Sequence, residues 1–289
     1  MLKQKVALLG LGIMGQGMAG RLLSAGFPLR VYNRNPAKAD ALAKSGARVA
    51  RMPGEAANDA DVIIAMVSDD VASREIWMGG NGALAAARPG TCLVEASTLS
   101  VQWVKELADA AAKQKCGFLD APVTGSKPQA AEGQLLFLVG GSADVLDRAR
   151  PVLAAMSRDI VYLGPTGSGA RLKLINNFLC GVQAASLAEA MSMIQAGGLD
   201  PEKSLSVLTG GAPASPLIKL ISARAASGDK DTNFILRLMA KDLGYARDEA
   251  KRSGLTSQTS SAALEIFKMA IEKGYGDMDV SAVVNSVTK

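Results

Sequence analysis

Short apolar runs alternate with segments of helical spacing through the first half of the chain. The runs are rich in β-branched and aliphatic residues and are separated by turn-forming residues such as Gly, Pro, Asn and Asp, a pattern typical of strands. We predict strands at residues 6–9, 29–32, 62–65, 92–95, 117–119, 135–139 and 160–162. We predict helices between them, among others at residues 14–25, 36–44, 101–115 and 143–155. This alternation predicts an α/β fold in which a doubly wound, mostly parallel sheet carries helices on both faces.

The pattern changes after residue 163. From about residue 170 to 196 the chain contains no proline and one glycine, Gly181, while apolar residues recur at steps of three and four. This spacing predicts one helix of about 27 residues, near 40 Å long. The Asp200-Pro201 and Ser215-Pro216 pairs and Gly254 mark the boundaries of further helices. We therefore predict a first domain at 1–163 and an all-α C-terminal domain at 164–289, joined by a long interdomain helix.

The composition mainly excludes classes of protein and of partner. A chain of 289 residues with 48% apolar content can bury a large core and is not disordered. The net charge is only +5, and no run of Lys or Arg exceeds two residues, so we expect no nucleic-acid partner. No apolar run approaches the roughly 20 residues of a membrane span. Three cysteines without CxxC spacing favour a reducing compartment without a structural metal, and we expect a cytoplasmic protein.

The stretch GLGIMG, Gly10 to Gly15, follows the first predicted strand and opens the first predicted helix. In that setting the glycines permit a tight turn, a close approach to a pyrophosphate, and close packing of the helix on the strand. The alternative is a purely structural glycine turn. We predict a dinucleotide site, and thus a Rossmann-type domain, with contacts from Gly10, Gly12, Ile13, Met14 and Gly15.

The end of the second predicted strand bears on the choice of dinucleotide. An acidic residue there would bind the ribose hydroxyls of NAD, but this chain has Asn33, followed by Arg34 and, one helical turn later, Lys38. Without the carboxylate a 2′-phosphate is not repelled, and a guanidinium offers paired donors to it. We therefore predict NADP(H) rather than NAD(H). The alternative is that Arg34 and Lys38 are solvated surface charges.

Lys173 is the candidate proton donor. The chain contains no histidine, so proton transfer near neutral pH requires another group, and lysine is well suited to that role. Lys173 and Asn177 lie four residues apart, on one face of the long predicted helix, and Gly167 and Gly169 precede them. The alternative is a lysine that extends along an apolar helix to reach solvent.

Five stretches together resemble the β-hydroxyacid dehydrogenases, which include 3-hydroxyisobutyrate dehydrogenase, tartronate semialdehyde reductase and the glyoxylate/succinate semialdehyde reductases. They are GLGIMGQGMAGRLLSAG, EASTLS, DAPVTGSKPQAAEGQL, GSGARLKLINN and KDLGYA, in the order and spacing of that family. The resemblance covers nearly the whole chain. It implies a Rossmann domain, a long interdomain helix and an all-helical C-terminal domain, in a homodimer or homotetramer.

The resemblance also implies roles for individual residues. It makes Lys173 the catalytic acid/base and Asn177 its support. Thr124 and Gly125 take the places of a substrate-binding serine and glycine. Ser97 is a further candidate for binding the substrate carboxylate.

On the cofactor side, the resemblance assigns contacts to Thr98 and Lys241. We add Val67 and Ser68, which follow the third predicted strand. Where the family usually has an aspartate, this chain has Glu95, so the residue at the strand end stays acidic but has a longer side chain.

The stretch GSKPQAAEGQL and the Asn-Arg pair after the second strand look closest to the glyoxylate/succinate semialdehyde reductases. The resemblance thus implies that NADPH reduces a small carboxylate-bearing aldehyde to its hydroxy acid. The alternatives are a dehydrogenase of 3-hydroxyisobutyrate or tartronate semialdehyde type, an imine reductase, and a cofactor-binding module without catalysis. Lys173 argues against an imine reductase, because that family commonly has another residue there.

Overall fold

The computed structural model describes residues 3–228 and 231–287. The chain forms two compact units, Met1–Lys173 and Leu174–Lys289. The division lies within the long helix α9 (Ser168–Ala196), whereas the predicted boundary lay before it. The first turn of α9 belongs to the first unit because it packs on that unit's sheet: a Cβ at Gly169 would lie only 2.2 Å from the carbonyl oxygen of Leu138.

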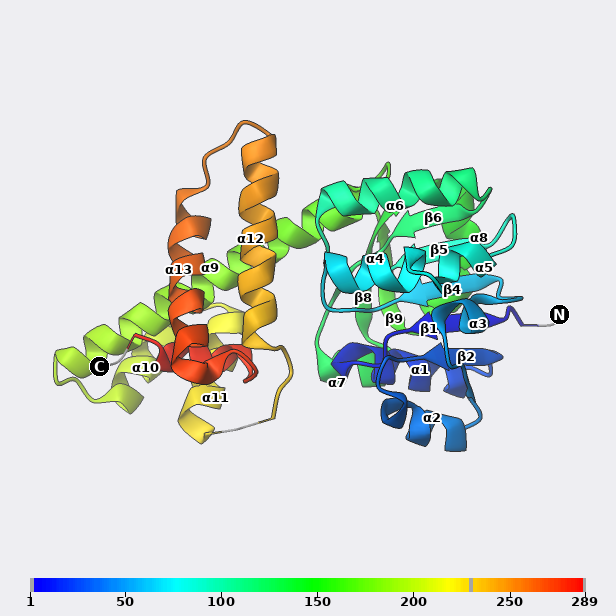
Figure 1. Ribbon diagram of the computed structural model, residues 1–289. Helices are drawn as coiled ribbons and strands as arrows, with labels where there is room; N and C mark the ends of the chain where they lie inside the picture. Colours follow the sequence, from blue (N-terminus) through cyan, green and yellow to red (C-terminus); the bar gives the residue numbers. More distant parts are fainter. Residues whose placement is uncertain (1–2, 229–230, 288–289) are drawn as a thin grey trace. The chain divides into compact units, whose positions relative to one another are not determined.

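In the described part of the first unit, nine strands form one sheet in the order β3-β2-β1-β4-β5-β6-β8-β7, and β9 also pairs with β8 (Figure 1). The six neighbouring strands β3, β2, β1, β4, β5 and β6 are parallel to one another. Strand β8 runs antiparallel to β6, and β9 is parallel to β8. The strands are β1 (Val6–Leu9), β2 (Leu29–Tyr32), β3 (Arg48–Val49), β4 (Val62–Ala65), β5 (Cys92–Glu95), β6 (Gly117–Asp120), β7 (Val123–Thr124), β8 (Leu135–Gly141) and β9 (Ser157–Tyr162).

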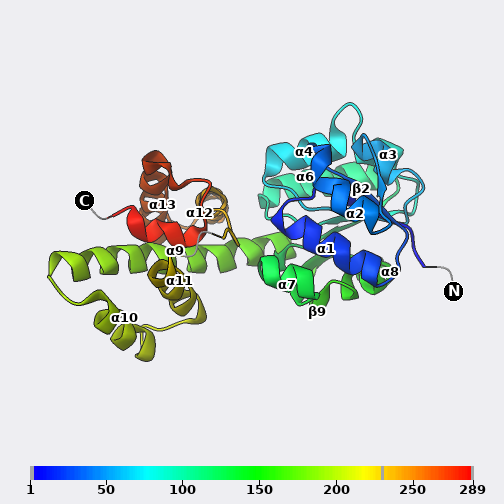
Figure 2. The ribbon, with the colours of Figure 1, turned by 90° about the horizontal axis from the view of Figure 1, so that it is seen from below.

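Helices cover both faces of this sheet. In Figure 2, α1, α7 and α8 lie on one face and α3, α4 and α6 on the other. The helical segments are α1 (Ile13–Ser24), η1 (Pro36–Ala39), α2 (Asp40–Lys44), α3 (Pro53–Ala57), α4 (Asp70–Met78), α5 (Ala83–Ala86), α6 (Val101–Lys113), α7 (Lys127–Glu132) and α8 (Ala143–Ala154). The predicted doubly wound α/β fold is confirmed.

The central strands are buried on both faces, which explains why they are continuous apolar runs rather than alternating ones. Every residue of β1, β4 and β5 is buried. The predicted strands 6–9, 29–32, 62–65 and 92–95 coincide with β1, β2, β4 and β5, and the other three are longer than predicted. Strands β3 and β7 were not predicted, because two residues are too few to show a periodicity.

In its described part the second unit contains helices and no strand, apart from an isolated antiparallel bridge between Ile235 and Asp279. Besides the remainder of α9 it contains α10 (Pro201–Gly210), α11 (Pro216–Ser227), α12 (Leu236–Arg252), α13 (Gln258–Ala270), η2 (Ile271–Tyr275) and η3 (Val280–Asn285). Helices α12 and α13 lie side by side in Figure 1, and their core includes Leu243 and Phe267. Gly181 lets α9 approach α12, since a Cβ there would lie 2.8 Å from Leu243. The predicted all-α second half is confirmed.

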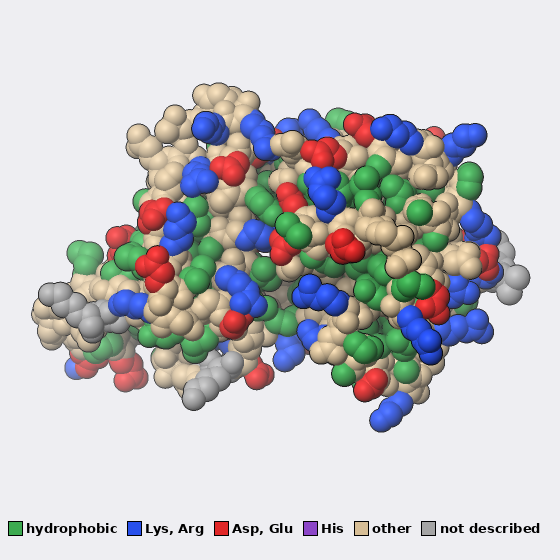
Figure 3. All heavy atoms as spheres, viewed as in Figure 1, with side chains coloured by type: hydrophobic (Ala, Val, Ile, Leu, Met, Phe, Trp, Pro, Cys, Tyr) green, Lys and Arg blue, Asp and Glu red, His purple; other side chains and the backbone are tan. Residues whose placement is uncertain are grey.

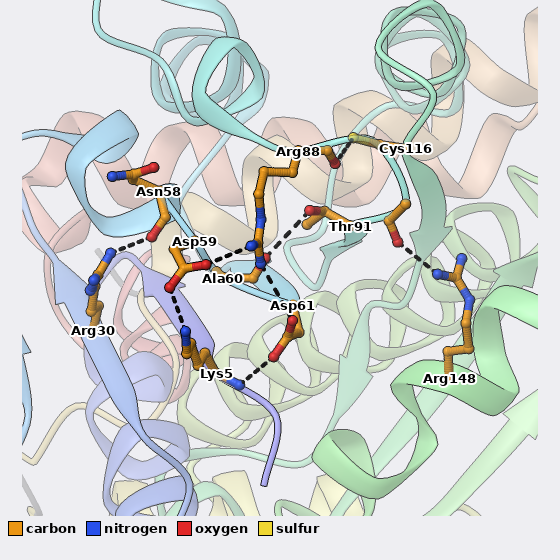
Figure 4. A network of polar contacts seen from close by, with 11 residues as sticks. Lys5, Arg30, Asn58, Asp59, Ala60, Asp61, Arg88, Thr91, Cys116 and Arg148 are labelled. Carbon is orange, nitrogen blue, oxygen red and sulfur yellow. Dashed lines mark hydrogen bonds and ion pairs between the residues drawn. The ribbon is translucent and has the colours of Figure 1, made fainter. Parts of the chain in front are cut away.

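Charges at the amino ends of the parallel strands form an ion-pair network at the surface of the first unit (Figure 4). Asp59 pairs with Lys5 and Arg88, and Asp61 accepts a 2.8 Å hydrogen bond from the Lys5 backbone N–H. Lys5, Asp59 and Arg88 are 55%, 40% and 51% exposed, so water reaches all three. The hydrogen bond from Lys5 lowers the pKa of Asp59, with further help from the Arg88 charge.

On the face that Figure 3 shows, basic and acidic side chains are interspersed rather than gathered by sign. Among the described residues, no helix combines the length and the apolar character needed to cross a bilayer.

Candidate active site

Five parallel strands of the first unit end at the same edge of the sheet, and most of the predicted site residues of that unit follow them. Leu9 is the register partner of Tyr32 and of Ala65, Ala65 pairs with Glu95, and Glu95 pairs with Asp120. The strand order reverses between β1 and β4. In open α/β sheets, ligands bind outside the carboxyl ends of the strands at such a reversal.

The glycine turn after β1 has the geometry that a pyrophosphate needs. Gly10 has φ +101°, and a Cβ there would lie 2.2 Å from the Met66 carbonyl oxygen. A Cβ at Gly15 would lie 2.0 Å from the carbonyl oxygen of Gly10. By contrast, no heavy atom lies within 4 Å of a Cβ position at Gly12, so the space beside the second glycine is open.

The start of α1 is also suited to an anion. Ile13 and Met14 are its first two residues, and the N-cap residue Gly12 has no side chain to occupy their N–H groups. The first turn contains no acidic residue. Free N–H groups and the helix dipole favour a negative charge at such an end, so the residues present fit the diphosphate of a dinucleotide.

Asn33 holds the glycine turn in place. Its Oδ1 accepts a 2.9 Å hydrogen bond from the Leu11 N–H, and its Nδ2 donates one of 2.8 Å to the Asn35 carbonyl oxygen. Arg34 and Lys38 follow β2 in the chain and are exposed. Within residues 3–228 and 231–287, no hydrogen bond or ion pair holds either of these two side chains. Both cations are therefore available to a ligand.

Glu95, at the end of β5, is fully buried and accepts hydrogen bonds from several groups. Its Oε2 accepts from the Ser73 hydroxyl at 2.6 Å and from the Trp77 indole N–H at 2.8 Å. Its Oε1 accepts from the Ser97 backbone N–H at 2.9 Å, while the Trp103 indole donates to the Ser73 hydroxyl at 2.9 Å. Burial raises the pKa of Glu95, and these donors oppose that rise only in part.

The network continues into the loops where cofactor contacts were predicted. Ser97 is 2% exposed, and its hydroxyl accepts a 2.8 Å hydrogen bond from the Val67 N–H, so it joins the loops that follow β4 and β5. Ser68 is exposed and donates to Asp69, the N-cap of α4, and Thr98 is partly buried. The structure thus places Val67, Ser97 and Thr98 together and uses the Ser97 side chain to hold the loop.

Thr124 is the last residue of β7, and Gly125 follows it in the loop to α7, which packs against α1. The approach is close, since a Cβ at Gly17 would lie 2.8 Å from the backbone of Ala130. Gly125 has φ +113°, in the region that favours glycine. Because α1 begins at the glycine turn, the packing of α7 on α1 fixes the glycine turn and the segment of Gly125 relative to each other.

Lys173 lies in the second turn of α9 and is buried, with 9% exposed. The start of α9 is held by Asp120, a fully buried residue at the end of β6 that sequence reasoning did not single out. Its carboxylate accepts 2.8 Å hydrogen bonds from the Gly167 and Ala170 N–H groups. No local pattern identifies this contact, because about fifty residues separate its partners.

Asn177 is one helical turn beyond Lys173 on α9, and its surroundings in the second unit are polar. It is 4% exposed and donates a 2.6 Å hydrogen bond from Nδ2 to Asp242 Oδ2. Lys241 pairs with the other carboxylate oxygen of Asp242 at 3.0 Å and lies over the Tyr245 ring. Sequence reasoning assigned Asn177 and Lys241 but missed Asp242, the buried residue that connects them.

Two family profiles match almost the whole chain. The NAD binding domain of 6-phosphogluconate dehydrogenase matches residues 5–164, and the NAD-binding domain of NADP-dependent 3-hydroxyisobutyrate dehydrogenase matches residues 167–287. The NAD-dependent L-serine dehydrogenase of Pseudomonas aeruginosa is 36% identical over 97% of this chain and 96% of its own length. This chain belongs to the β-hydroxyacid dehydrogenase family.

Other members of the family are also similar over nearly all of this chain. The chloroplastic glyoxylate/succinic semialdehyde reductase 2 of Arabidopsis thaliana is 34% identical over 98% of this chain and 79% of its own length. The structure of Mycobacterium tuberculosis 3-hydroxyisobutyrate dehydrogenase with L-serine superimposes with a TM-score of 0.88, at 33% identity, over 99% of this chain and all of that one. The predicted family and the predicted class, an NAD(P)-dependent oxidoreductase, are confirmed.

Proposed function

We propose that this β-hydroxyacid dehydrogenase reduces a small aldehyde acid, of the glyoxylate or succinate semialdehyde type, to the hydroxy acid with NADPH, and that Lys173 donates the proton. The observation that carries the proposal is the buried position of Lys173 in a chain without histidine. A buried ammonium on the helix of Asn177 is suited to proton transfer rather than to surface solvation.

The residues of the first unit would hold the cofactor at the carboxyl edge of the sheet. The glycine turn and the N–H groups of Ile13 and Met14 would bind its diphosphate, and the Val67 and Thr98 segments would flank its remaining parts. When bound, the nicotinamide supplies the hydride. Binding the substrate and transferring the proton would fall to residues of this chain.

Lys173 would act on the oxygen of the aldehyde. Its ammonium stabilises negative charge that develops there, and then it gives up a proton to complete the hydroxyl group. Such stabilisation is worth several kcal/mol where water is excluded. Asn177 would orient the substrate or the ammonium through its amide, which Asp242 fixes by accepting from Nδ2. Thr124 and Gly125 would bind the substrate carboxylate.

Three observations support NADPH over NADH. Asn33 provides no carboxylate and is occupied with Leu11 and Asn35, so nothing at that strand end repels a 2′-phosphate. Arg34 and Lys38 are exposed beside it without partners in the described chain. The profile that matches the second half describes an NADP-dependent enzyme, although the Pseudomonas relative is named as NAD-dependent.

A second candidate function is oxidation of a 3-hydroxy acid such as 3-hydroxyisobutyrate or L-serine. The names of the Pseudomonas relative and of the Mycobacterium structure favour it. The same residues would then work in reverse, with Lys173 accepting the proton of the hydroxyl group. The cytoplasmic location and the homo-oligomeric state stay predictions.

The deciding experiment assays glyoxylate, succinate semialdehyde, methylmalonate semialdehyde and tartronate semialdehyde with NADPH and NADH, and 3-hydroxyisobutyrate and L-serine with NADP and NAD. We expect the highest kcat/KM for glyoxylate or succinate semialdehyde with NADPH. A tenfold preference for NADH would contradict the assigned cofactor, and a preference for L-serine would establish the second candidate.

The same assay tests the proton donor. Lys173→Ala should lower kcat by at least about a hundredfold, because general acid catalysis is lost, while NADPH still binds. Lys113→Ala, which removes an exposed lysine from α6 of the same unit, is the matched control and should keep wild-type kcat. Wild-type turnover by Lys173→Ala would rule out the assigned role.

A further inference from the structure

Asp120 connects a strand of the sheet to the start of the helix that carries Lys173. Its Oδ1 accepts from the Gly167 N–H and its Oδ2 from the Ala170 N–H, both at 2.8 Å. The side chain is fully buried. Both carboxylate oxygens therefore serve N–H groups that α9 itself leaves without an intrahelical partner.

Two glycines make room for this contact. A Cβ at Gly140, on β8, would lie 2.6 Å from Asp120 Oδ1. A Cβ at Gly169 would lie 2.2 Å from the Leu138 carbonyl oxygen and 2.8 Å from that of Asp120. The first turn of α9 is thus pressed against β6 and β8, and Asp120 supplies the polar contacts there.

The position of Asp120 in the chain relates this contact to the substrate. Lys173 lies one turn beyond Ala170 on α9, and Thr124 and Gly125 lie just beyond Asp120, after β6. One side chain therefore holds the helix of the proton donor to the strand that leads into the loop proposed to bind the substrate carboxylate.

We propose that Asp120 is a positioning residue for Lys173: it fixes the first turn of α9 on β6 and thereby sets the place of the ammonium relative to the substrate loop. The proposal rests on the proposed function of Lys173. A carboxylate is needed because an asparagine offers only one acceptor oxygen and would turn its NH₂ group toward an N–H donor. The N-terminus of a 29-residue helix also favours an anion.

The test is Asp120→Asn in the full chain. We expect kcat to fall about 10- to 100-fold, because small displacements of catalytic groups have effects of that size, while KM for the aldehyde and Kd for NADPH change less than about threefold. Amide hydrogen exchange of residues 167–173 should accelerate at least about tenfold, since two hydrogen bonds that hold this turn become one. Wild-type exchange in that segment, or kcat within twofold of wild type, would overturn the proposal.

Asp279→Asn is the matched control. Asp279 is also buried and also accepts from distant backbone N–H groups, those of Asn233 at 2.8 Å and Phe234 at 3.1 Å, but it belongs to the second unit and does not touch α9 through these bonds. The Asp279→Asn variant should be less stable than wild type yet keep kcat within about twofold of the wild-type value. If both variants lost kcat in step with their thermal stability, Asp120 would be only a structural residue.

A second variant covers the case that Asp120→Asn fails to fold. Gly167→Ala keeps the carboxylate but strains the donor, because Gly167 has φ +93° and a Cβ there would lie 3.3 Å from Val101. As with Asp120→Asn, kcat of Gly167→Ala should fall while KM stays nearly constant, and amide exchange of residues 167–173 should accelerate, both to a smaller degree. Unchanged exchange and kcat would count against the proposal. The exchange measurement needs no substrate, so it decides the role of Asp120 at the start of α9 even if no aldehyde is reduced.

Discussion

The two ends of the parallel strands in the first unit both collect polar side chains, but the two sets differ in burial and in partners. At the amino ends, Lys5, Asp59 and Arg88 pair as ions within reach of water. At the carboxyl ends, Glu95 and Asp120 are fully buried and accept from N–H and O–H groups. Solvent screens the charges of the first set, whereas the second set is stabilised by hydrogen bonds that need defined distances and directions.

The difference separates a solvated edge from one whose loops are held in fixed positions. Exposed ion pairs contribute little to stability, because water competes with them and screens them. A buried carboxylate is expensive unless donors surround it, and each donor becomes costly once the carboxylate is removed. The carboxyl edge therefore fixes its loops rigidly, which suits a site where a glycine turn, Ser97 and the start of α9 need defined positions.

Glu95→Ala should break this arrangement most strongly. It leaves the Ser73 hydroxyl, the Trp77 indole and the Ser97 N–H without their acceptor in a fully buried place, so the free energy of unfolding should fall by about 3–5 kcal/mol. Urea unfolding followed by tryptophan fluorescence measures the loss. Trp77 and Trp103 are the chain's two tryptophans, and both belong to this network, so the signal reports on the first unit.

Asp59→Ala at the amino edge is the comparison for that measurement. Its loss should be much smaller than that of Glu95→Ala, because the partners of Asp59 remain solvated. Equal losses at the two edges would show that burial does not distinguish them.

Gly15→Ala should have the next largest effect, and on binding rather than on stability alone. A Cβ placed 2.0 Å from the carbonyl oxygen of Gly10 forces the glycine turn to move, so Kd for NADPH should rise about a hundredfold. Gly20→Ala, on the same helix with nothing within 4 Å of its Cβ position, should bind NADPH normally and gain helix stability. Calorimetric titration of both variants checks this, and equal affinity would contradict the assigned cofactor site.

The smallest predicted effect is a pH dependence of opposite sign at the two edges. Burial raises the pKa of Glu95, so the folded state binds its proton more tightly than the unfolded state does. The stability advantage of wild type over Glu95→Gln should be largest below about pH 4 and should shrink as pH rises through that raised pKa.

Asp59 should behave in the opposite way. The hydrogen bond from Lys5 lowers the pKa of Asp59, so the advantage of wild type over Asp59→Asn should be complete above about pH 4 and should shrink as pH falls through that lowered pKa. Urea midpoints from about pH 2 to about pH 8 for both variants measure the two slopes. Slopes of the same sign would contradict the comparison.

Local pattern was enough to locate much of the fold. Strands β1, β4 and β5 are buried on both faces, so each appears in the sequence as an apolar run between turn residues, and the prediction matched their bounds. The glycine turn was also readable, since Gly10 and Gly15 occupy positions where a side chain has no room. The long helix was predicted within two residues of its first residue, Ser168.

Contacts between segments distant in the chain could not be predicted from local sequence patterns. Glu95 was noted only as an acidic strand end, and Asp120 and Asp242 were not assigned, because their roles depend on Trp77, Gly167 and Asn177, which the fold brings to them from elsewhere in the chain. The same holds for the first turn of α9, which the sequence assigns to the helix but the packing of Gly169 assigns to the first unit.

The sequence by itself thus determined the order of strands and helices and the glycine turn, and it singled out Lys173 as the candidate proton donor. These depend on residue type and spacing, which are local properties of a chain. Only the tertiary structure decided which buried carboxyls hold those pieces in place, because a carboxylate acquires its function from the donors that folding brings within hydrogen-bond distance.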